Sequence, residues 1–132
     1  MGIRVFFPGN KKVHADLGNY IVESDQPVNG GGDGTAPAPY ELFLASLATC
    51  AGIYVKGFCD SRGINAENIE LYQDLKWDPI KHAPAAINID IRVPADFPIK
   101  YYDMLVNAVN HCAVKNTIAN PPQFNVKTTA LV

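Results

Sequence analysis

Apolar and polar positions alternate in three short runs through the first 24 residues. The runs 3–7, 13–17 and 20–24 are rich in β-branched and aromatic side chains. Turn signals separate them, Pro-Gly-Asn at 8–10 and Gly-Asn at 18–19. This pattern predicts a meander of three short antiparallel strands.

A much longer apolar segment follows, and its spacing indicates a helix over residues 39–62. Pro39 suits the first helical position, Glu41 lies in the first turn where an acid is favourable, and Gly63 is a suitable stop. The apolar residues cover most of the helix circumference instead of one stripe. Such a helix must be covered on all sides, and one sheet covers only one of them, so we expect a second helix from a symmetry mate.

The second half of the chain returns to strands and then shorter helices. Residues 69–77 alternate imperfectly, and residues 85–93 alternate well, with the isoleucines at 87, 89 and 91 on one face. A helix over 98–110, a helical turn over 112–119 and a closing strand over 124–131 complete the prediction. Strands and helices are segregated, which favours an α+β fold with antiparallel sheets, built as a single domain over residues 1–132.

Charge and composition narrow the class of protein. The 132 residues are 48% apolar and carry 11 Lys and Arg against 13 Asp and Glu, without a basic run. Nucleic acid and anionic membranes are therefore not expected partners. Pro8 interrupts the first apolar run, which is therefore unlike the apolar region of a signal peptide. The longest apolar stretch, 42–55, is too short to span a bilayer. These features predict a cytoplasmic protein whose cysteines are thiols.

A glycine-rich loop, residues 28–37, precedes the long helix. A phosphate-binding loop would end in Gly-Lys-Ser or Gly-Lys-Thr, whereas this one ends in Pro-Ala-Pro. We interpret it as a flexible connection to the helix.

Three cysteines are the main candidates for chemistry. Cys50 lies in the middle of the apolar helix, where a small buried core residue and a reactive thiol are both possible. Cys112 lies near the start of a short helix, whose free amides and dipole favour a thiolate. Cys59 is nine residues after Cys50 and therefore half a turn out of phase with it. The chain has no Cys-x-x-Cys, so neither a metal site nor a thioredoxin-like site is expected.

Two segments together resemble the OsmC-like and organic hydroperoxide resistance proteins. The first is GGGDGTAPAPYELFLASLATC at 30–50, a glycine-rich loop and helix start that lead to a cysteine in the helix. The second is HCAVKNT at 111–117, where a cysteine opens a short helix. The order of elements is similar over essentially the whole chain.

The resemblance implies a fold, a partner and an activity. The fold would be an intertwined homodimer in which antiparallel sheets wrap around two long central helices. The activity would be that of a thiol peroxidase, an antioxidant enzyme of the oxidative stress response, with an organic hydroperoxide as substrate and an external dithiol as reductant. Cys50 would be the peroxidatic thiolate and Cys112 the resolving thiol, without a cofactor.

The resemblance also implies two charged site residues. Glu41 would match the helix-start glutamate that orients an arginine at the thiolate, and Arg4 is the positional match for that arginine. Glu41 lies about 13 Å along the helix and half a turn from Cys50, so it would serve the Cys50 of an antiparallel mate. First-turn stabilisation of the helix is the alternative role for Glu41. In the hydroperoxide-resistance branch the glutamate lies one residue earlier, at Tyr40 here, which aligns this chain with a less characterised branch.

The substrate pocket and the overall function each leave alternatives. Phe43, Leu47 and Tyr54 share a helical stripe with Cys50 and would line an apolar substrate pocket, or they simply pack in the core. A first alternative function is redox sensing or small-molecule binding on the same fold without efficient turnover. A second is a structural dimer whose cysteines only fill the core.

Overall fold

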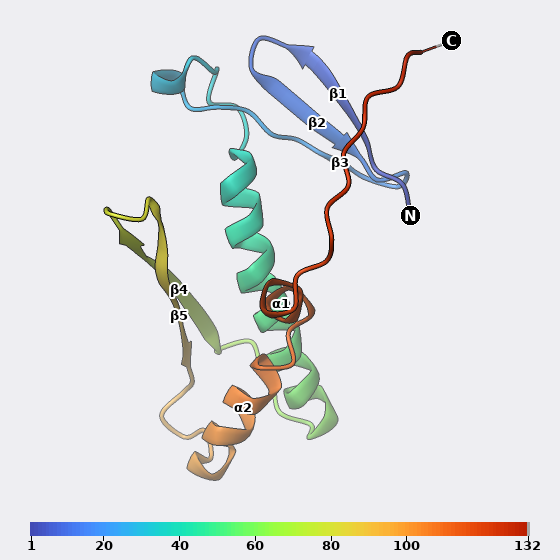
Figure 1. Cartoon of the computed structure of the whole chain (residues 1–132). Helices are drawn as coiled ribbons and strands as arrows, with labels where there is room; N and C mark the ends of the chain where they lie inside the picture. Colours follow the sequence, from blue (N-terminus) through green and yellow to red (C-terminus); the bar gives the residue numbers. More distant parts are fainter. Residues whose placement is uncertain (132) are drawn as a thin grey trace. The chain divides into compact units, whose positions relative to one another are not determined.

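The computed structural model describes residues 1–131, which divide into two compact units. The first comprises Met1–Ser46, and the second runs from Leu47 to the end of the described chain. Antiparallel sheets occur together with three α-helices, which confirms the predicted α+β class. Figure 1 shows the elements in chain order.

The first unit contains the predicted meander. Strands β1 (Arg4–Gly9), β2 (Lys12–Asp16) and β3 (Ile21–Val22) pair antiparallel in that order. The sequence predicted that the first strand ends before Pro8, whereas β1 continues through Pro8 to Gly9. Pro8 is tolerated because β1 is an edge strand and the register shifts between Phe6 and Gly9.

The glycine-rich loop of this unit is ordered around one buried carboxylate, contrary to the flexible connection predicted. Asp25 is fully buried and accepts hydrogen bonds from the amide of Gln26 (2.7 Å) and from the hydroxyl (2.7 Å) and amide (3.1 Å) of Thr35. Lys12 Nζ lies 3.9 Å from the same carboxylate and also pairs with Asp33. These contacts close the loop, which includes the 3-10 helix η1 (Val28–Gly30), over Asp25.

A close backbone approach fixes the same loop. The backbone of Gly32 lies so near that of Gln26 that a Cβ on residue 32 would overlap the Gln26 carbonyl. Only glycine fits at this position.

Helix α1 (Pro39–Ser61) has almost the predicted bounds. It ends where Gly63 adopts a left-handed conformation (φ 66°) and Ile64 N donates to the carbonyl of Cys59 (2.9 Å). Leu47, Ala51, Val55 and Cys59 form its buried stripe. Other apolar positions of α1 remain exposed in the single chain.

α1 is also long and apolar enough to cross a membrane. One 18-residue window has a mean hydropathy of 1.6, and 28% of that window is buried inside the chain. Core helices of soluble proteins have the same length and composition, and the buried stripe of α1 packs in a protein core.

The second unit combines α1 with a hairpin and two short helices. β4 (Glu70–Asp78) and β5 (Ala83–Arg92) pair antiparallel, with Leu71 opposite Ile91 and Gln73 opposite Ile89. The predicted helix over 98–110 is instead a 3-10 turn, η2 (Ile99–Tyr101), followed by α2 (Tyr102–Val109). Helix α3 (Ala113–Ala119) follows after a three-residue connection.

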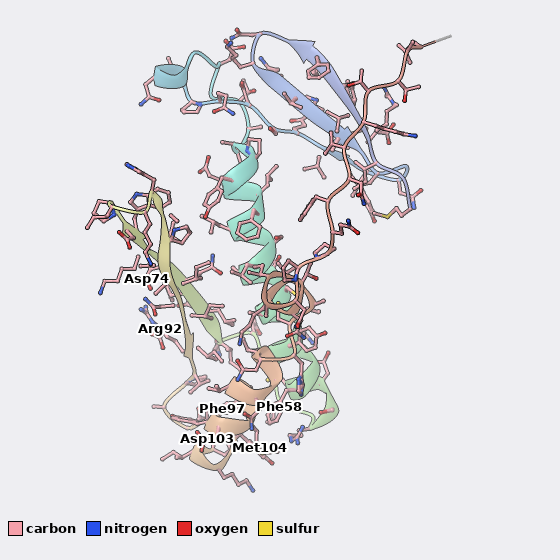
Figure 2. The ribbon with its side chains drawn as sticks, in the orientation of Figure 1. Phe58, Asp74, Arg92, Phe97, Asp103 and Met104 are labelled. Carbon is pink, nitrogen blue, oxygen red and sulfur yellow. The ribbon has the colours of Figure 1, made fainter. Side chains whose placement is uncertain are left out.

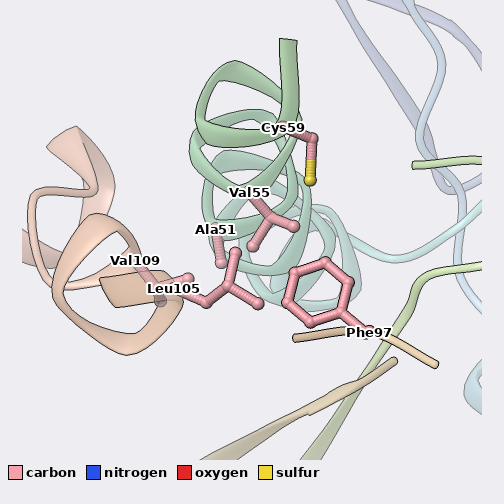
Figure 3. Close-up of a cluster of buried hydrophobic side chains, with 6 residues drawn as sticks. All are labelled: Ala51, Val55, Cys59, Phe97, Leu105 and Val109. Carbon is pink, nitrogen blue, oxygen red and sulfur yellow. The ribbon is translucent and has the colours of Figure 1, made fainter. Parts of the chain in front are cut away.

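The core of this unit lies between α1, α2 and the segment before η2. Its buried members are Ala51, Val55, Cys59, Phe97, Leu105 and Val109 (Figure 3). Ile89 and Ile91 of the hairpin pack against this cluster, as the alternation of β5 predicted. Phe58 packs against it too, and Figure 2 shows Phe58 and Phe97 at the same end of the unit, whereas Asp74 and Arg92 lie out on the hairpin.

The predicted closing strand is absent from the described chain. Residues 120–131 form no helix or strand, and Phe124 and Val126 are 82% and 96% exposed. A strand exists only where a neighbour satisfies its backbone hydrogen bonds, and within the single chain this segment has none.

Candidate active site

Helix α1 and the start of α3 bring two thiols together in the second unit. Cys112 follows α2, where its amide donates to the carbonyl of Val109 (3.0 Å), and it is the N-cap residue of α3. Cys50 faces it from α1. Cys112 is buried (1% exposed), whereas Cys50 is partly exposed, and both are free thiols.

A hydrogen bond joins the two thiols, and their pKa values are shifted in opposite directions. The pKa of Cys50 is lowered below its ordinary value, first by the hydrogen bond from Cys112 and then by the amides of Val114 and Ala113. The pKa of Cys112 is raised, first by burial and then by the same hydrogen bond. Cys50 is therefore the thiol that ionises first, with Cys112 as its protonated neighbour.

The opposite pKa shifts of the two thiols correct one expectation from the sequence, the thiolate on Cys112. The amides at the start of α3 were expected to favour a thiolate on Cys112. They do lower its pKa, but burial outweighs them, and the thiol that benefits is Cys50. The amide of Val114 therefore acts on both thiols and the amide of Ala113 on Cys50, and sequence reasoning missed their effect on Cys50.

Cys59 has a different environment. It is fully buried in the core cluster, and burial is the main cause that raises its pKa. A buried protonated thiol is a poor nucleophile.

Both a protein family and several solved structures resemble this chain. The family described as OsmC-like protein matches residues 31–127, which include both Cys50 and Cys112. This chain belongs to the OsmC-like family. No curated protein matches it.

Solved structures of the OsmC-like type share its fold. A proposed osmotic stress induced and detoxification response protein from Psychrobacter arcticus 273-4 has a TM-score of 0.73 at 19% identity, over 89% of this chain and 87% of that one. The organic hydroperoxide resistance protein OsmC of Legionella pneumophila has a TM-score of 0.55 at 20% identity, over 89% and 87%. The organic hydroperoxide resistance protein OhrB of Bacillus subtilis has a TM-score of 0.52 at 23% identity, over 91% and 93%.

Arg4 of this OsmC-like protein has its contacts in the first unit. It lies on β1, 3.7 Å from Asp16 and with its guanidinium 4.8 Å from the centre of the Phe6 ring. Its side chain is 69% exposed. The role of Arg4 at a thiolate stays a prediction.

Glu41 has a local structural role in the OsmC-like chain. Its carboxylate accepts a hydrogen bond from the amide of Ala38 (3.0 Å), immediately before the first residue of α1. This is the glutamate half of a capping box, which satisfies an amide that the helix leaves free. The contact fits the helix-start alternative, and the predicted orientation of an arginine stays untested.

The three predicted pocket residues have different environments. Leu47 is buried, and Phe43 contacts the ring of Tyr40 with 5.6 Å between ring centres. Tyr54 lines an open hollow formed by α1, α2 and His111. Phe43 and Tyr54 are both partly exposed, and the role of the three residues in a substrate pocket stays a prediction.

Proposed function

We propose that this OsmC-like protein is a cysteine-based hydroperoxide reductase of the oxidative stress response. The observation that carries the proposal is the hydrogen-bonded pair of free thiols, in which the pKa of Cys50 is lowered and that of Cys112 is raised. Membership of a family that includes hydroperoxide resistance proteins supports the same activity.

In the proposed first step, Cys50 is the nucleophile. Its thiolate attacks the terminal oxygen of the hydroperoxide, the O–O bond breaks, and Cys50 becomes a sulfenic acid. The departing alkoxide takes a proton from solvent and leaves as the alcohol. The lowered pKa of Cys50 raises the fraction of thiolate at neutral pH, and its partial exposure admits the peroxide.

In the second step, Cys112 resolves the intermediate. Its sulfur attacks the sulfenic sulfur of Cys50, the S–O bond breaks, and the hydroxyl leaves as water with the thiol proton. An external dithiol then reduces the Cys50–Cys112 disulfide by two exchanges and is itself oxidised to a disulfide. The contact between the thiols means that resolution needs little movement of the chain.

The proposed assembly is a homodimer. The apolar side chains of the 124–131 segment are exposed in the single chain, and its alternation suits a strand that lacks a neighbour. A second copy would supply that neighbour and cover the exposed apolar positions of α1. We expect sedimentation to show a dimer, weakened when the chain is cut after Ala119. The cytoplasm, which keeps thiols reduced, is the proposed compartment.

A redox-sensing role with slow turnover is the second candidate, favoured by one observation. In residues 47–131, the groups that lower the pKa of Cys50 are a thiol and two amides, and none of them carries a positive charge. A neighbouring cation is the usual means of activating a thiolate, and without one the attack is slower. Disulfide formation in a single turnover, without sustained consumption of peroxide, would favour this role.

The test is consumption of cumene hydroperoxide with a dithiol reductant. We expect the wild-type protein to consume it and Cys50→Ser to lose all consumption above the protein-free rate. Cys59→Ser is the matched control, since it removes a thiol from the same helix that has no part in the proposed chemistry. Equal rates in wild type and Cys50→Ser would overturn the peroxidase proposal.

A further inference from the structure

A small cavity of mixed polarity lies in the second unit, between two loops that carry no cysteine. One loop, residues 64–68, connects α1 to β4, and the other, residues 94–98, connects β5 to η2. The cavity between them, called the loop cavity below, has a volume of about 330 Å³. This volume lies at the lower end of the range for small-molecule pockets. Neither Cys50 nor Cys112 lines it, so it is separate from the thiol pair.

Turns hold both loops of the loop cavity in place. In the first loop, the side-chain oxygen of Asn65 accepts a hydrogen bond from the amide of Glu67 (2.9 Å). In the second, the amide of Phe97 donates to the carbonyl of Pro94 (2.9 Å). Pro94 and Pro98 restrict the backbone on either side of this turn. A ligand would therefore meet a cavity that is already formed, and its binding would cost little ordering of the loops.

One side of the loop cavity is apolar and belongs to the protein core. Phe97 is 6% exposed and is a member of the buried cluster, so packing fixes its position (Figure 3). Ile64 packs against the same cluster. This side can cover the hydrocarbon part of a small molecule, but it offers no hydrogen bond from a side chain.

The other side of the loop cavity carries one negative charge. Asp96 is the charged residue among those that line the cavity, all of which lie in the described chain. Within residues 1–131 its carboxylate takes part in none of the ion pairs. The remaining polar lining consists of the side-chain amides of Asn65 and Asn68. A carboxylate with amide groups beside it favours a ligand that donates hydrogen bonds and carries a positive charge.

We propose that the loop cavity binds a small organic cation, with an ammonium group at Asp96 and a hydrocarbon body against Ile64 and Phe97. The two sides of the cavity match the two parts of such a molecule. No thiol takes part, so this binding goes beyond the proposed reductase activity and does not depend on it.

The test is a titration of the whole protein at pH 7 with cyclohexylammonium, followed through the backbone amide signals in NMR. We expect the shifted signals to concentrate in residues 64–68 and 94–98. Cyclohexanol has the same ring without the charge and should bind about threefold more weakly or worse. Methylammonium has the charge without the ring and should bind about tenfold more weakly or worse, because it buries little apolar surface.

Two matched variants locate the charge that the ligand recognises. Asp96→Asn should weaken binding of cyclohexylammonium about threefold or more and leave binding of cyclohexanol unchanged. Asp103→Asn is the control, since it removes the same charge from an exposed residue of α2 that does not line the cavity. Figure 2 shows Asp103 at the same end of the unit as Phe97. Asp103→Asn should bind as the wild type does, because the general charge of this end of the protein is then not the cause.

Four outcomes would overturn the inference. They are equal affinity for cyclohexylammonium and cyclohexanol, unchanged affinity in Asp96→Asn, an equal loss in Asp103→Asn, and shifted signals that lie outside the two loops.

Cys50→Ser separates this inference from the proposed function. It should bind cyclohexylammonium with wild-type affinity, since no thiol lines the loop cavity. Wild-type binding by a protein that consumes no peroxide would support the loop cavity while the reductase proposal fails. Loss of binding in Cys50→Ser would instead place the cation at the thiols and remove the inference.

Discussion

Asp25 in the first unit and Cys50 in the second are both acids whose pKa is lowered by hydrogen bonds. The pKa of Asp25 is lowered to about 2, first by the hydroxyl of Thr35 and then by the amides of Thr35 and Gln26 and the charge of Lys12. Cys50 receives its first hydrogen bond from Cys112 and further ones from two amides. The same physical effect therefore acts in a loop and at a thiol pair.

The two regions differ in the groups that donate hydrogen bonds to Asp25 and to Cys50. The hydroxyl, amides and ammonium around Asp25 keep their protons throughout the neutral range, so its environment is constant and closes the loop. The first partner of Cys50 is itself a thiol, which loses its proton when it forms a disulfide. In this protein the lowered pKa of Asp25 therefore accompanies a closed loop, whereas the lowered pKa of Cys50 accompanies a neighbour that can react with it.

The largest expected effect is on the stability of the Asp25 loop. In Gly32→Ala the new Cβ overlaps the Gln26 carbonyl, and a backbone group cannot move aside as a flexible side chain can. We expect a loss of about 3 kcal/mol or more in the free energy of unfolding, measured by urea denaturation. Gly30→Ala is the control, since its Cβ would lie 3.4 Å from the Pro27 ring and make ordinary contact. Wild-type stability in Gly32→Ala would mean that the loop is not rigid.

The next-largest effect is expected on the reactivity of Cys50 when Cys112 is replaced. Cys112→Ala removes the first cause of the lowered pKa of Cys50, so that pKa should rise and less thiolate should be present at pH 7. We expect Cys50 to react several-fold more slowly with iodoacetamide at pH 7, and at the wild-type rate at high pH where the thiol is fully ionised. Cys112→Ser keeps a hydroxyl donor and should retain part of the wild-type rate. Equal rates in all three proteins would show that Cys112 does not activate Cys50.

The pH dependence of stability tests the contribution of the Asp25 carboxylate. Because folding lowers the pKa of Asp25 from 3.8 to about 2, its contribution is complete above pH 3.8 and is lost as the pH falls through about 2. We expect the melting temperature of the wild type to fall over this range, with Asp25→Asn less stable at pH 7 and less steep in acid. An identical acid slope in both proteins would assign the effect to other carboxylates.

The smallest effect concerns Cys59, a thiol without a reactive partner. Cys59→Ala should leave the iodoacetamide reactivity of the native protein unchanged, because the thiol is fully buried and its pKa is raised. Mass spectrometry after labelling checks this. Loss of a rapidly labelled site in this variant would contradict the assignment of reactivity to Cys50.

The sequence allowed the elements that depend on local pattern to be predicted. The N-terminal meander, α1 with its stop at Gly63, and the isoleucine face of β5 all follow from periodicity and from turn and cap residues. The pairing of Cys50 with Cys112 rested on the resemblance to a family, because residues this far apart in sequence leave no local signal of contact. The prediction of a closing strand over 124–131 was wrong for the single chain. Alternation of apolar and polar residues shows that a segment suits a strand, but not whether a neighbouring strand is present to pair with it.

Two features of the sites needed three-dimensional information. The order of the loop around Asp25 depends on Thr35 and Lys12 reaching one carboxylate, which a glycine-rich sequence does not indicate. The acidities of the thiols depend on burial, and burial of Cys112 reversed the effect expected from its place at a helix start. The N-cap position of Cys112 was the one local signal for the site amides.

The distance along the chain between the paired thiols links turnover to the lifetime of the protein. A bond between Cys50 and Cys112 would close a loop of roughly 60 residues, which restricts the unfolded chain and stabilises the native state by about 4 kcal/mol. In the proposed cycle the reduced form is therefore more easily unfolded and degraded than the oxidised one. If the proposed cycle operates, a cell rich in peroxide would thereby protect this protein from proteolysis.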